Sequence, residues 1–292
     1  MGLLNGFEHI VREQEPLAPY TWLRLGGEAE YFAEPTSVAE LSSLVRYCRK
    51  HEVPLHVLGG GSKLLIRDQG VPGLVVHLAP PAFSEVRVDG QDVIAGAGAK
   101  LGHVISIAVR EGLAGLEHLV GIPGTIGGAL RGNAGTESHD IGQWTKWAKV
   151  MTRCGQIVEH QRDDLRFAYR YSSLDELVIL QAGLSLEAED RTDLIKRMQT
   201  LWIVRRSRQP SSEKNVGRIF KNPSGMRASE LIEQAGLKGT KIGGAEIGEQ
   251  DANNVVAGAN ASSDEVLRLI ELVQLQVRER LGVELEMDIE IW

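Results

Sequence analysis

The 292-residue sequence has little cysteine and no long apolar run. Two cysteines cannot build a disulfide scaffold and no secretory signal accompanies them, so they indicate a reducing compartment. No stretch approaches the ~20 apolar residues of a membrane helix, and residues 1–16 resemble neither a signal peptide nor an anchor. Acidic residues outnumber basic ones by 39 to 32, which gives no electrostatic reason to bind nucleic acid. We therefore expect a cytoplasmic protein with no membrane or nucleic-acid partner.

Two common classes of site are also missing from the sequence. The eight histidines show neither the HxH nor the HExxH spacing, so no metal site is predicted. No glycine-rich segment matches a Walker loop or the GxGxxG fingerprint of a Rossmann unit. Glycine is nevertheless abundant, at 33 of 292 residues against a usual share of about 7%. The positions of these glycines carry most of the functional information.

The length predicts two domains, and the first part of the chain reads as an α/β layer. Ser37 and Glu40 form a capping-box pattern that predicts a helix over Val38–His51. Apolar runs at Pro54–Leu58 and Gly73–Leu78 predict buried strands, whereas residues 1–18 show no clear period.

The rest of the chain gives further hairpin, helix and strand signals. A hairpin is predicted around Gly90, a helix over Leu101–Glu111, and a polar helix over Asp190–Arg208. A loop at Gln209–Ser212 marks a domain junction. The remaining predicted elements are a hairpin of Trp147–Thr152 and Gln156–Glu159, a strand over Leu177–Glu187, helices over Arg227–Ala235 and from Ser262 to Gly282, and a terminal strand over Val283–Trp292.

Two glycine-rich loops favour a ligand that carries a diphosphate. Gly59–Ser62 follows a predicted strand, and a helix is predicted to start after Gly121–Gly128. Glycine permits positive φ and lets backbone N–H groups approach a phosphate closely. One such loop alone is more often just a tight turn, but two of them, the second followed by Asn133-Ala134-Gly135, favour diphosphate binding.

Motifs that run from Thr21–Gly27 through the two glycine-rich loops to Ile242–Glu246 resemble, in content and order, those of the MurB family, the UDP-N-acetylenolpyruvoylglucosamine reductases, over residues 18–291. The chain resembles the shorter subclass, because no large insertion separates Gln209 from Ile219. The motifs that carry the resemblance occur in the family's order and are Thr21–Gly27, Leu58–Ser62 with Leu64–Ile66, Gly121–Ala129, Asn133–Gly135, Phe167–Ser173, Ile219–Pro223, Ala235–Gly239 and Ile242–Glu246.

The resemblance implies a fold and a cofactor. An FAD-binding domain of the vanillyl-alcohol-oxidase (PCMH) type, mixed α/β, would have its two halves at 17–79 and 80–188, and an α+β substrate domain would occupy 189–292. FAD would be non-covalent, since Gly59–Lys63 contains no His or Cys, and NADPH would be the hydride donor. The implied cofactor-binding residues are Leu58, Gly59, Gly60, Gly61, Ser62, Lys63, Gly121, Ile122, Pro123, Gly124, Thr125, Gly127, Gly128, Asn133, Ala134 and Gly135.

The family's chemistry needs an arginine, an acid and a C-terminal glutamate, and the resemblance assigns Arg170 as the arginine. A planar guanidinium suits a carboxylate or an enolate-like oxygen. Tyr169, Lys221 and Asn222 are the implied substrate-binding residues.

Two of the three implied catalytic positions depart from the family. Arg218 stands where the family has Ser or Cys, and a guanidinium stays protonated to at least pH ~12. Ser211, Ser212, Ser224 or water could supply the proton instead, and spacing selects none of these. Asp288 stands where the family has Glu, with Glu286 and Glu290 as rivals, because strand alternation would place all three on one face.

For several lesser departures from the family and isolated residues, packing or exposure to solvent is an alternative to a functional role. Lys63 replaces the family's usual Asn and could neutralise a phosphate or point to solvent. Asp251 and Asn254 replace a usual His and a usual aromatic residue. The basic stretch Trp202–Arg208 could bind a diphosphate, but a solvated helix face is the default, and His118 is more simply a packed or solvated side chain than a flavin contact.

Three functions remain open from the sequence. The first is the reductase of peptidoglycan synthesis, acting on a UDP-sugar, with a monomer slightly favoured. The second is a flavin-binding relative that has lost the reaction. The third is a flavin oxidoreductase for another acidic substrate, with Arg170 and Arg218 as an anion clamp.

Overall fold

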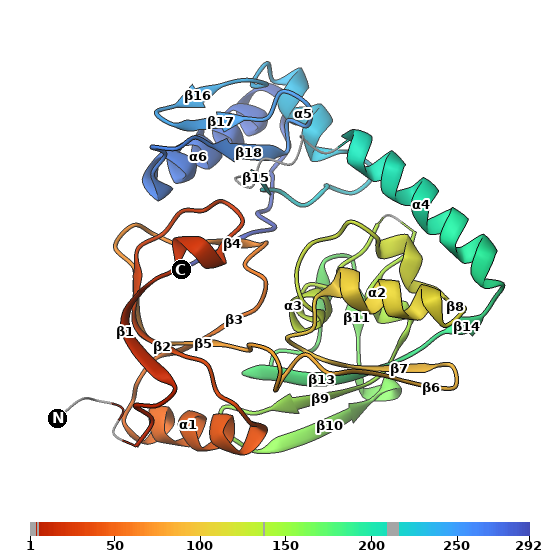
Figure 1. Cartoon of the computed structure of the whole chain (residues 1–292). Coiled ribbons are helices and arrows are strands. Elements are labelled where there is room, and N and C mark those ends of the chain that lie inside the picture. Colours follow the sequence, from red (N-terminus) through yellow and green to blue (C-terminus); the bar gives the residue numbers. More distant parts are fainter. Residues whose placement is uncertain (1–3, 5, 137, 209–215) are drawn as a thin grey trace. The chain divides into compact units, whose positions relative to one another are not determined.

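A computed structural model of the chain describes residues 4, 6–136, 138–208 and 216–292 (Figure 1). It divides into two compact units. The first unit comprises residues up to 13, 31–60 and 72–205, and the second comprises 14–30, 61–71 and the residues from 206 onward. The limits 17–79, 80–188 and 189–292 stay a prediction. The units differ from them because 14–30 and 61–71 group with the C-terminal part of the chain, where β4 (Leu64–Leu65) pairs in parallel with β19 (Glu290–Ile291).

A five-stranded antiparallel sheet lies in the first unit, in the order β10-β9-β13-β7-β6. The predicted hairpin around Gly90 is confirmed, since Asp89 pairs with Asp92 and Gly90 has a φ of 59°. The strands are β6 (Val86–Asp89), β7 (Asp92–Gly96), β9 (Thr145–Met151), β10 (Ile157–Gln161) and β13 (Val178–Ser185).

A four-stranded sheet has the order β1-β2-β5-β3, with β3 and β5 parallel. Its strands are β1 (Val11–Pro16), β2 (Glu28–Ala33), β3 (Leu55–Leu58) and β5 (Val71–His77). Strand β1 lies within residues 1–18, where the sequence showed no clear period. It was missed because its sequence, VREQEP, is polar and belongs to an edge strand without a buried face.

Helix α1 (Val38–Lys50) is confirmed, and Ser37 caps it by accepting from the Glu40 amide at 3.1 Å. Its capping box is only half formed, because the Glu40 carboxylate accepts from the Thr36 amide. Helix α4 (Arg191–Arg208) begins in the first unit, and its last three residues group with the second. The other elements of the first unit are α2 (Leu101–Arg110), α3 (Ile126–Arg131), β8 (Leu113–Ala114), β11 (Phe167–Ala168), β12 (Tyr171–Ser172), β14 (Glu187–Ala188), η2 (Leu116–Leu119), η3 (Ile141–Gln143) and η4 (Arg162–Asp164).

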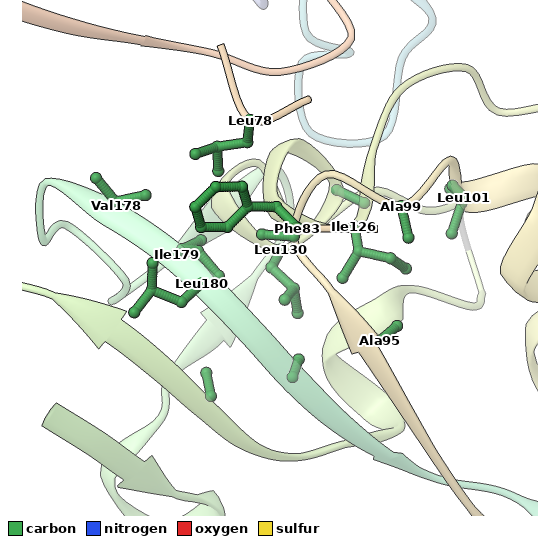
Figure 2. Close-up of a cluster of buried hydrophobic side chains, with 14 of the residues drawn as sticks. Leu78, Phe83, Ala95, Ala99, Leu101, Ile126, Leu130, Val178, Ile179 and Leu180 are labelled. Carbon is green, nitrogen blue, oxygen red and sulfur yellow. The ribbon is translucent and has the colours of Figure 1, made fainter. Parts of the chain in front are cut away.

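The core of the first unit forms where α3 packs on β13 and β7. Figure 2 shows Phe83 at the centre of a cluster contributed by a loop, two strands and two helices. Residues labelled around it include Leu78, Ile126, Leu130 and Leu180, all less than a tenth exposed. This apolar packing supports the loop that enters α3, which is part of the predicted cofactor site.

The second unit has its own sheet and core. Its antiparallel sheet has the order β15-β18-β17-β16, and α6 carries the apolar stripe Val266, Leu269, Ile270, Val273 and Val277. The elements are η1 (Ala18–Tyr20), β4, β15 (Val216–Arg218), α5 (Ala228–Gln234), β16 (Lys241–Ile242), β17 (Ala245–Ile247), β18 (Asn254–Ala257), α6 (Ser263–Leu281) and β19. None of the helices in the described ranges is long and apolar enough to cross a membrane.

Two predictions for the second unit had opposite outcomes. The capping box of α6 is complete, with Ser262 and Glu265 bonded reciprocally, and Gly282 ends the helix at a φ of 69°. The predicted strand over Val283–Trp292 is wrong for most of its length, because only Glu290 and Ile291 form a strand and Met287 makes an isolated bridge.

Candidate functional site: a glycine cradle, an arginine turn and a C-terminal carboxylate

The two predicted glycine loops touch each other within the first unit. A Cβ atom on Gly60 would lie 2.7 Å from the Gly124 Cα, and one on Gly59 would lie 2.9 Å from the Thr125 Oγ1. No side chain fits at Gly60, because the obstacle is backbone. We call Gly59–Gly60 and Gly121–Gly128 the glycine cradle. Loops that pass this closely can present main-chain N–H groups to a diphosphate, so the residues present fit FAD.

Some predicted cofactor residues instead have their amides engaged by the protein. The Gly127 amide donates to Ala97 O at 2.8 Å, and next to it the amide of Ile126, which was not among the predicted residues, donates to Ala99 O at 2.9 Å. Ala134 donates to Ala129 O at 2.7 Å. These residues therefore fix the shape of the loop, and any direct contact with a cofactor stays a prediction.

An arginine from α4 supports the cradle. The Arg205 Nη1 donates to Val120 O at 2.6 Å and to Leu119 O at 3.3 Å. Its Cδ lies 2.9 Å from the position of a Cβ on Gly121. At this residue of the basic stretch, the solvated helix face expected by default is replaced by an anchor for the loop.

A buried carboxylate precedes the cradle, and no sequence pattern predicted it. The Glu117 side chain is 1% exposed, with its Oε1 3.0 Å from Arg197 Nε and 3.3 Å from His118 Nε2. The His118 ring stacks on His139 with centroids 3.8 Å apart. Burial lowers the pKa of His118, against the opposing effect of Glu117. His118 is thus a packed histidine, as the blander alternative held.

Arg170 occupies a strained turn. Strands β11 and β12 pair so that Ala168 faces Tyr171, which leaves Tyr169 and Arg170 as the two turn residues. Arg170 has a φ of 55°, which non-glycine residues adopt only when their surroundings impose it. Its guanidinium carbon lies 5.5 Å from the centre of the Tyr169 ring. Such imposed strain is typical of functional positions.

The Asn133 side chain is hydrogen-bonded to the strand that enters this turn. Its Nδ2 donates to Ala168 O at 2.8 Å, and its Oδ1 accepts from the Gly142 amide at 3.0 Å. The side chain is 2% exposed and both of its polar atoms are bonded to the protein. Asn133 therefore fixes the position of the hairpin that carries Arg170. The sequence had predicted only a cofactor contact for this residue, and that contact stays a prediction.

Three distant segments meet around Asp288 in the second unit. The Asp288 amide donates to Ile219 O at 2.7 Å, and the Lys221 amide donates to Glu286 O at 2.9 Å. On the other side, the Glu290 amide donates to Lys63 O at 2.8 Å. The C-terminal segment is thus bonded both to the segment that follows β15 and to the one that enters β4.

Asp288 differs in burial and in contacts from Glu286 and Glu290, the two alternative carboxylates. The Asp288 side chain is 6% exposed and its Oδ1 lies 2.7 Å from Lys63 Nζ. Glu286 is 73% exposed and pairs with Lys221, while Glu290 accepts from the Trp292 indole. The shared face expected from strand alternation was wrong, because residues 283–289 are not a strand. Lys63 contacts Asp288 while its side chain stays 40% exposed, and a contact of its ammonium group with a phosphate stays a prediction.

Arg218 lies on the exposed side of β15, opposite Asn254 of β18. Its Nη2 donates to Asn222 Oδ1 at 3.2 Å, and the same oxygen accepts from the Ala228 amide. Ser224 is exposed in the following turn, and Ser211 and Ser212 lie outside the described residues, as does the loop at Gln209–Ser212. Nothing here makes Arg218 an acid.

A buried asparagine fixes the start of this segment. Asn253 is fully buried, and its side chain bonds both the amide and the carbonyl of Phe220, at 2.9 and 2.8 Å. The contact spans 33 residues, and neither periodicity nor a motif pointed to it.

Comparison with known proteins agrees with this geometry. Residues 29–161 match an FAD binding domain, and residues 209–292 match the C-terminal domain of UDP-N-acetylenolpyruvoylglucosamine reductase. A protein of that name from Rhodopirellula baltica is 40% identical over 97% of this chain and 93% of its own length. The chain belongs to the UDP-N-acetylenolpyruvoylglucosamine reductase family.

Other members of the family, and more distant flavoproteins, extend the match. The reductase from Listeria welshimeri is 39% identical over 99% of this chain and 98% of its own. The crystal structure of the Thermus caldophilus reductase (MurB) aligns with a TM-score of 0.83 at 34% identity, covering 97% of this chain and 99% of that one. A 6-hydroxy-D-nicotine oxidase from Arthrobacter nicotinovorans, at 14% identity and a TM-score of 0.54 over 96% of this chain and 85% of that one, shares the fold alone. The fold is therefore an FAD-binding domain of the vanillyl-alcohol-oxidase type with a MurB C-terminal domain, as predicted.

Proposed function

We propose that this chain reduces UDP-N-acetylenolpyruvoylglucosamine to UDP-N-acetylmuramate in peptidoglycan synthesis. Non-covalent FAD and NADPH would be its cofactors. The observation that carries the proposal is the backbone contact between Gly60 and Gly124, which closes the glycine cradle in a chain that matches family members along its whole length. The first loop contains no His or Cys that could attach a flavin.

When bound, the flavin supplies the hydride for the reduction. The chain's own residues would bind, orient and protonate the substrate. Arg170, fixed at a strained turn, would meet the substrate carboxylate with a guanidinium that stays charged at any working pH. Tyr169 beside it, and Lys221 and Asn222 in the second unit, would complete substrate binding.

A second candidate function rests on Arg218 and Asp288, which replace the family's Ser or Cys and its Glu. Either departure could remove the reductase reaction while flavin binding persists, or could redirect the chain to another acidic substrate. If the substrate is another acidic compound, Arg170 and Arg218 would both bind its anionic group.

An anaerobic half-reaction distinguishes these functions. The FAD-loaded protein is reduced with NADPH, then mixed with UDP-N-acetylenolpyruvoylglucosamine while the visible flavin band is followed. Reoxidation by the substrate is the expected result. A flavin that stays reduced would reject the reductase proposal, and a chain that binds no flavin would reject all three functions.

The proposal also covers the cellular location and the oligomeric state of the protein. A nucleotide-sugar substrate and two free cysteines, one buried and one exposed, are consistent with a cytoplasmic enzyme. We also propose a monomer, which sedimentation of the FAD-loaded protein would test.

A further inference from the structure

The proposed reaction needs a proton donor, and the residue at the family's acid position cannot serve. Arg218 remains a cation at working pH and holds Asn222. The reduction adds a hydride to one carbon of a C=C bond and a proton to its neighbour. Another proton donor must therefore take its place.

Lys63 satisfies three structural requirements at once. It follows Gly60 of the glycine cradle by three residues in the sequence. Its carbonyl accepts from the Glu290 amide at 2.8 Å, which fixes its backbone against the C-terminal segment. Its Nζ lies 2.7 Å from the Asp288 Oδ1.

The exposure of the two partners suits proton transfer. The Asp288 side chain is 6% exposed and the Lys63 side chain is 40% exposed. The largely buried carboxylate can orient the ammonium group, while water can reach that group to replace a proton. Lys221 offers a weaker alternative, because its partner Glu286 is 73% exposed.

The same contact accounts for two of the family departures together. Asp288 is one methylene shorter than the family's Glu, and Lys63 is longer than the family's Asn. In this chain the two replacements meet, so the long side chain spans the distance that the short one leaves open.

We propose that Lys63, oriented by Asp288, is the proton donor of this chain, a role that rests on the proposed reductase function. The substrate's π electrons take a proton from Lys63 Nζ to form the new C–H bond at the carbon beside the one that receives hydride. The N–H bond breaks with its electron pair kept on nitrogen, and the neutral amine regains a proton from water.

The test uses FAD-loaded protein reduced with dithionite, so that reaction with NADPH is not involved. Lys63→Met should slow flavin reoxidation by UDP-N-acetylenolpyruvoylglucosamine by about 100-fold or more, as the loss of a general acid does. Lys241→Met removes an exposed lysine that pairs with Glu246, and should leave the rate within about threefold. A Lys63→Met rate close to wild type would overturn the proposal.

Amine rescue distinguishes a proton donor from a positioning residue. Lys63→Ala should regain reoxidation on addition of ethylammonium, whereas tetramethylammonium, which has no proton to give, should not restore it. Loss of rate without ethylammonium rescue would overturn the donor role. A wild-type chain whose reduced flavin persists would instead reject the proposed function itself.

A readout without flavin or turnover checks the orientation by Asp288. In the FAD-free protein, the ¹⁵N signal of the Lys63 ammonium group should be visible because its protons exchange slowly. Its identity is shown by its absence in Lys63→Arg. Asp288→Asn should broaden or remove the signal, and an unchanged signal would overturn the pairing on which the proposal depends.

Discussion

The glycine cradle and the surroundings of Asp288 are built from different kinds of contact. In the cradle, backbone meets backbone, and Gly60 has no room for even one carbon atom beside Gly124. Around Asp288, backbone hydrogen bonds join the segments and a side-chain ion pair is added to them, in which Lys63 reaches a shortened carboxylate. The five departures from the family, Lys63, Arg218, Asp251, Asn254 and Asp288, all lie in the second unit.

This difference has a physical origin. A backbone contact cannot be re-formed by changing a side chain, so a substitution there only adds strain. A side-chain ion pair can be replaced by another pair if length and charge are exchanged together. The comparison predicts that Gly60 in the cradle tolerates no side chain, whereas the surroundings of Asp288 tolerate paired changes.

The largest effect is expected in the second unit, at Asn253. Asn253→Ala would leave the amide and carbonyl of buried Phe220 without partners, at about 1–3 kcal/mol for each group. The melting temperature should fall by about 5–15 °C. Asn260→Ala, at an exposed turn, is the control and should change it little. Equal melting curves for the two variants would contradict this account of the segment from Ile219 to Lys221.

A cradle substitution should act on flavin binding. Gly60→Ala places a methyl group 2.7 Å from Gly124 Cα, and such overpacking costs about 1–3 kcal/mol. The Kd for FAD, measured by fluorescence quenching, should rise roughly 5- to 150-fold. Gly102→Ala in α2, where a Cβ would meet nothing within 4 Å, is the matched control. Undiminished FAD affinity in Gly60→Ala would show that the loops separate easily.

Asn133 should divide flavin binding from substrate reduction. Asn133→Asp keeps the acceptor for Gly142 but opposes a carboxylate oxygen to the Ala168 carbonyl, so the Arg170 turn should shift. We expect substrate-dependent reoxidation to slow by roughly 10- to 100-fold, because displacement of a catalytic group by about 1 Å can cost about 100-fold. The Kd for FAD should stay within about threefold. Gln143→Glu adds the same charge at an exposed position of η3 and should leave both values unchanged.

The sequence predicted features whose causes are local. The glycine loops, the hairpin around Gly90 and the capping box of α6 each depend on residues within a few positions, and all are confirmed. The cofactor and the fold followed from a resemblance carried by such motifs. The resemblance also aligned Asp288 with the family's glutamate, although spacing alone left its rivals open.

What the sequence did not predict depends on long-range contacts. Lys63 and Asp288 lie 225 positions apart, and their pairing requires β4 beside β19. Asn253 and Glu117 are polar residues that an amphipathic pattern places at the surface, yet each is buried because backbone or charged groups from elsewhere satisfy it. The discontinuous units have the same cause, since residues 61–71 bond to the C-terminal segment.

The smallest expected effect is a pH dependence of stability near the cradle. Burial lowers the pKa of His118 in the folded chain, so the unfolded chain binds the proton more readily. The stability contribution of neutral His118 is present above the ordinary histidine pKa of about 6.5 and is lost as pH falls through the lower folded value. His118→Asn should flatten the fall in melting temperature below about pH 6.5, while His103→Asn, at an exposed position of α2, should not. If both variants kept the wild-type profile, the stacked pair of His118 and His139 would have no part in acid sensitivity.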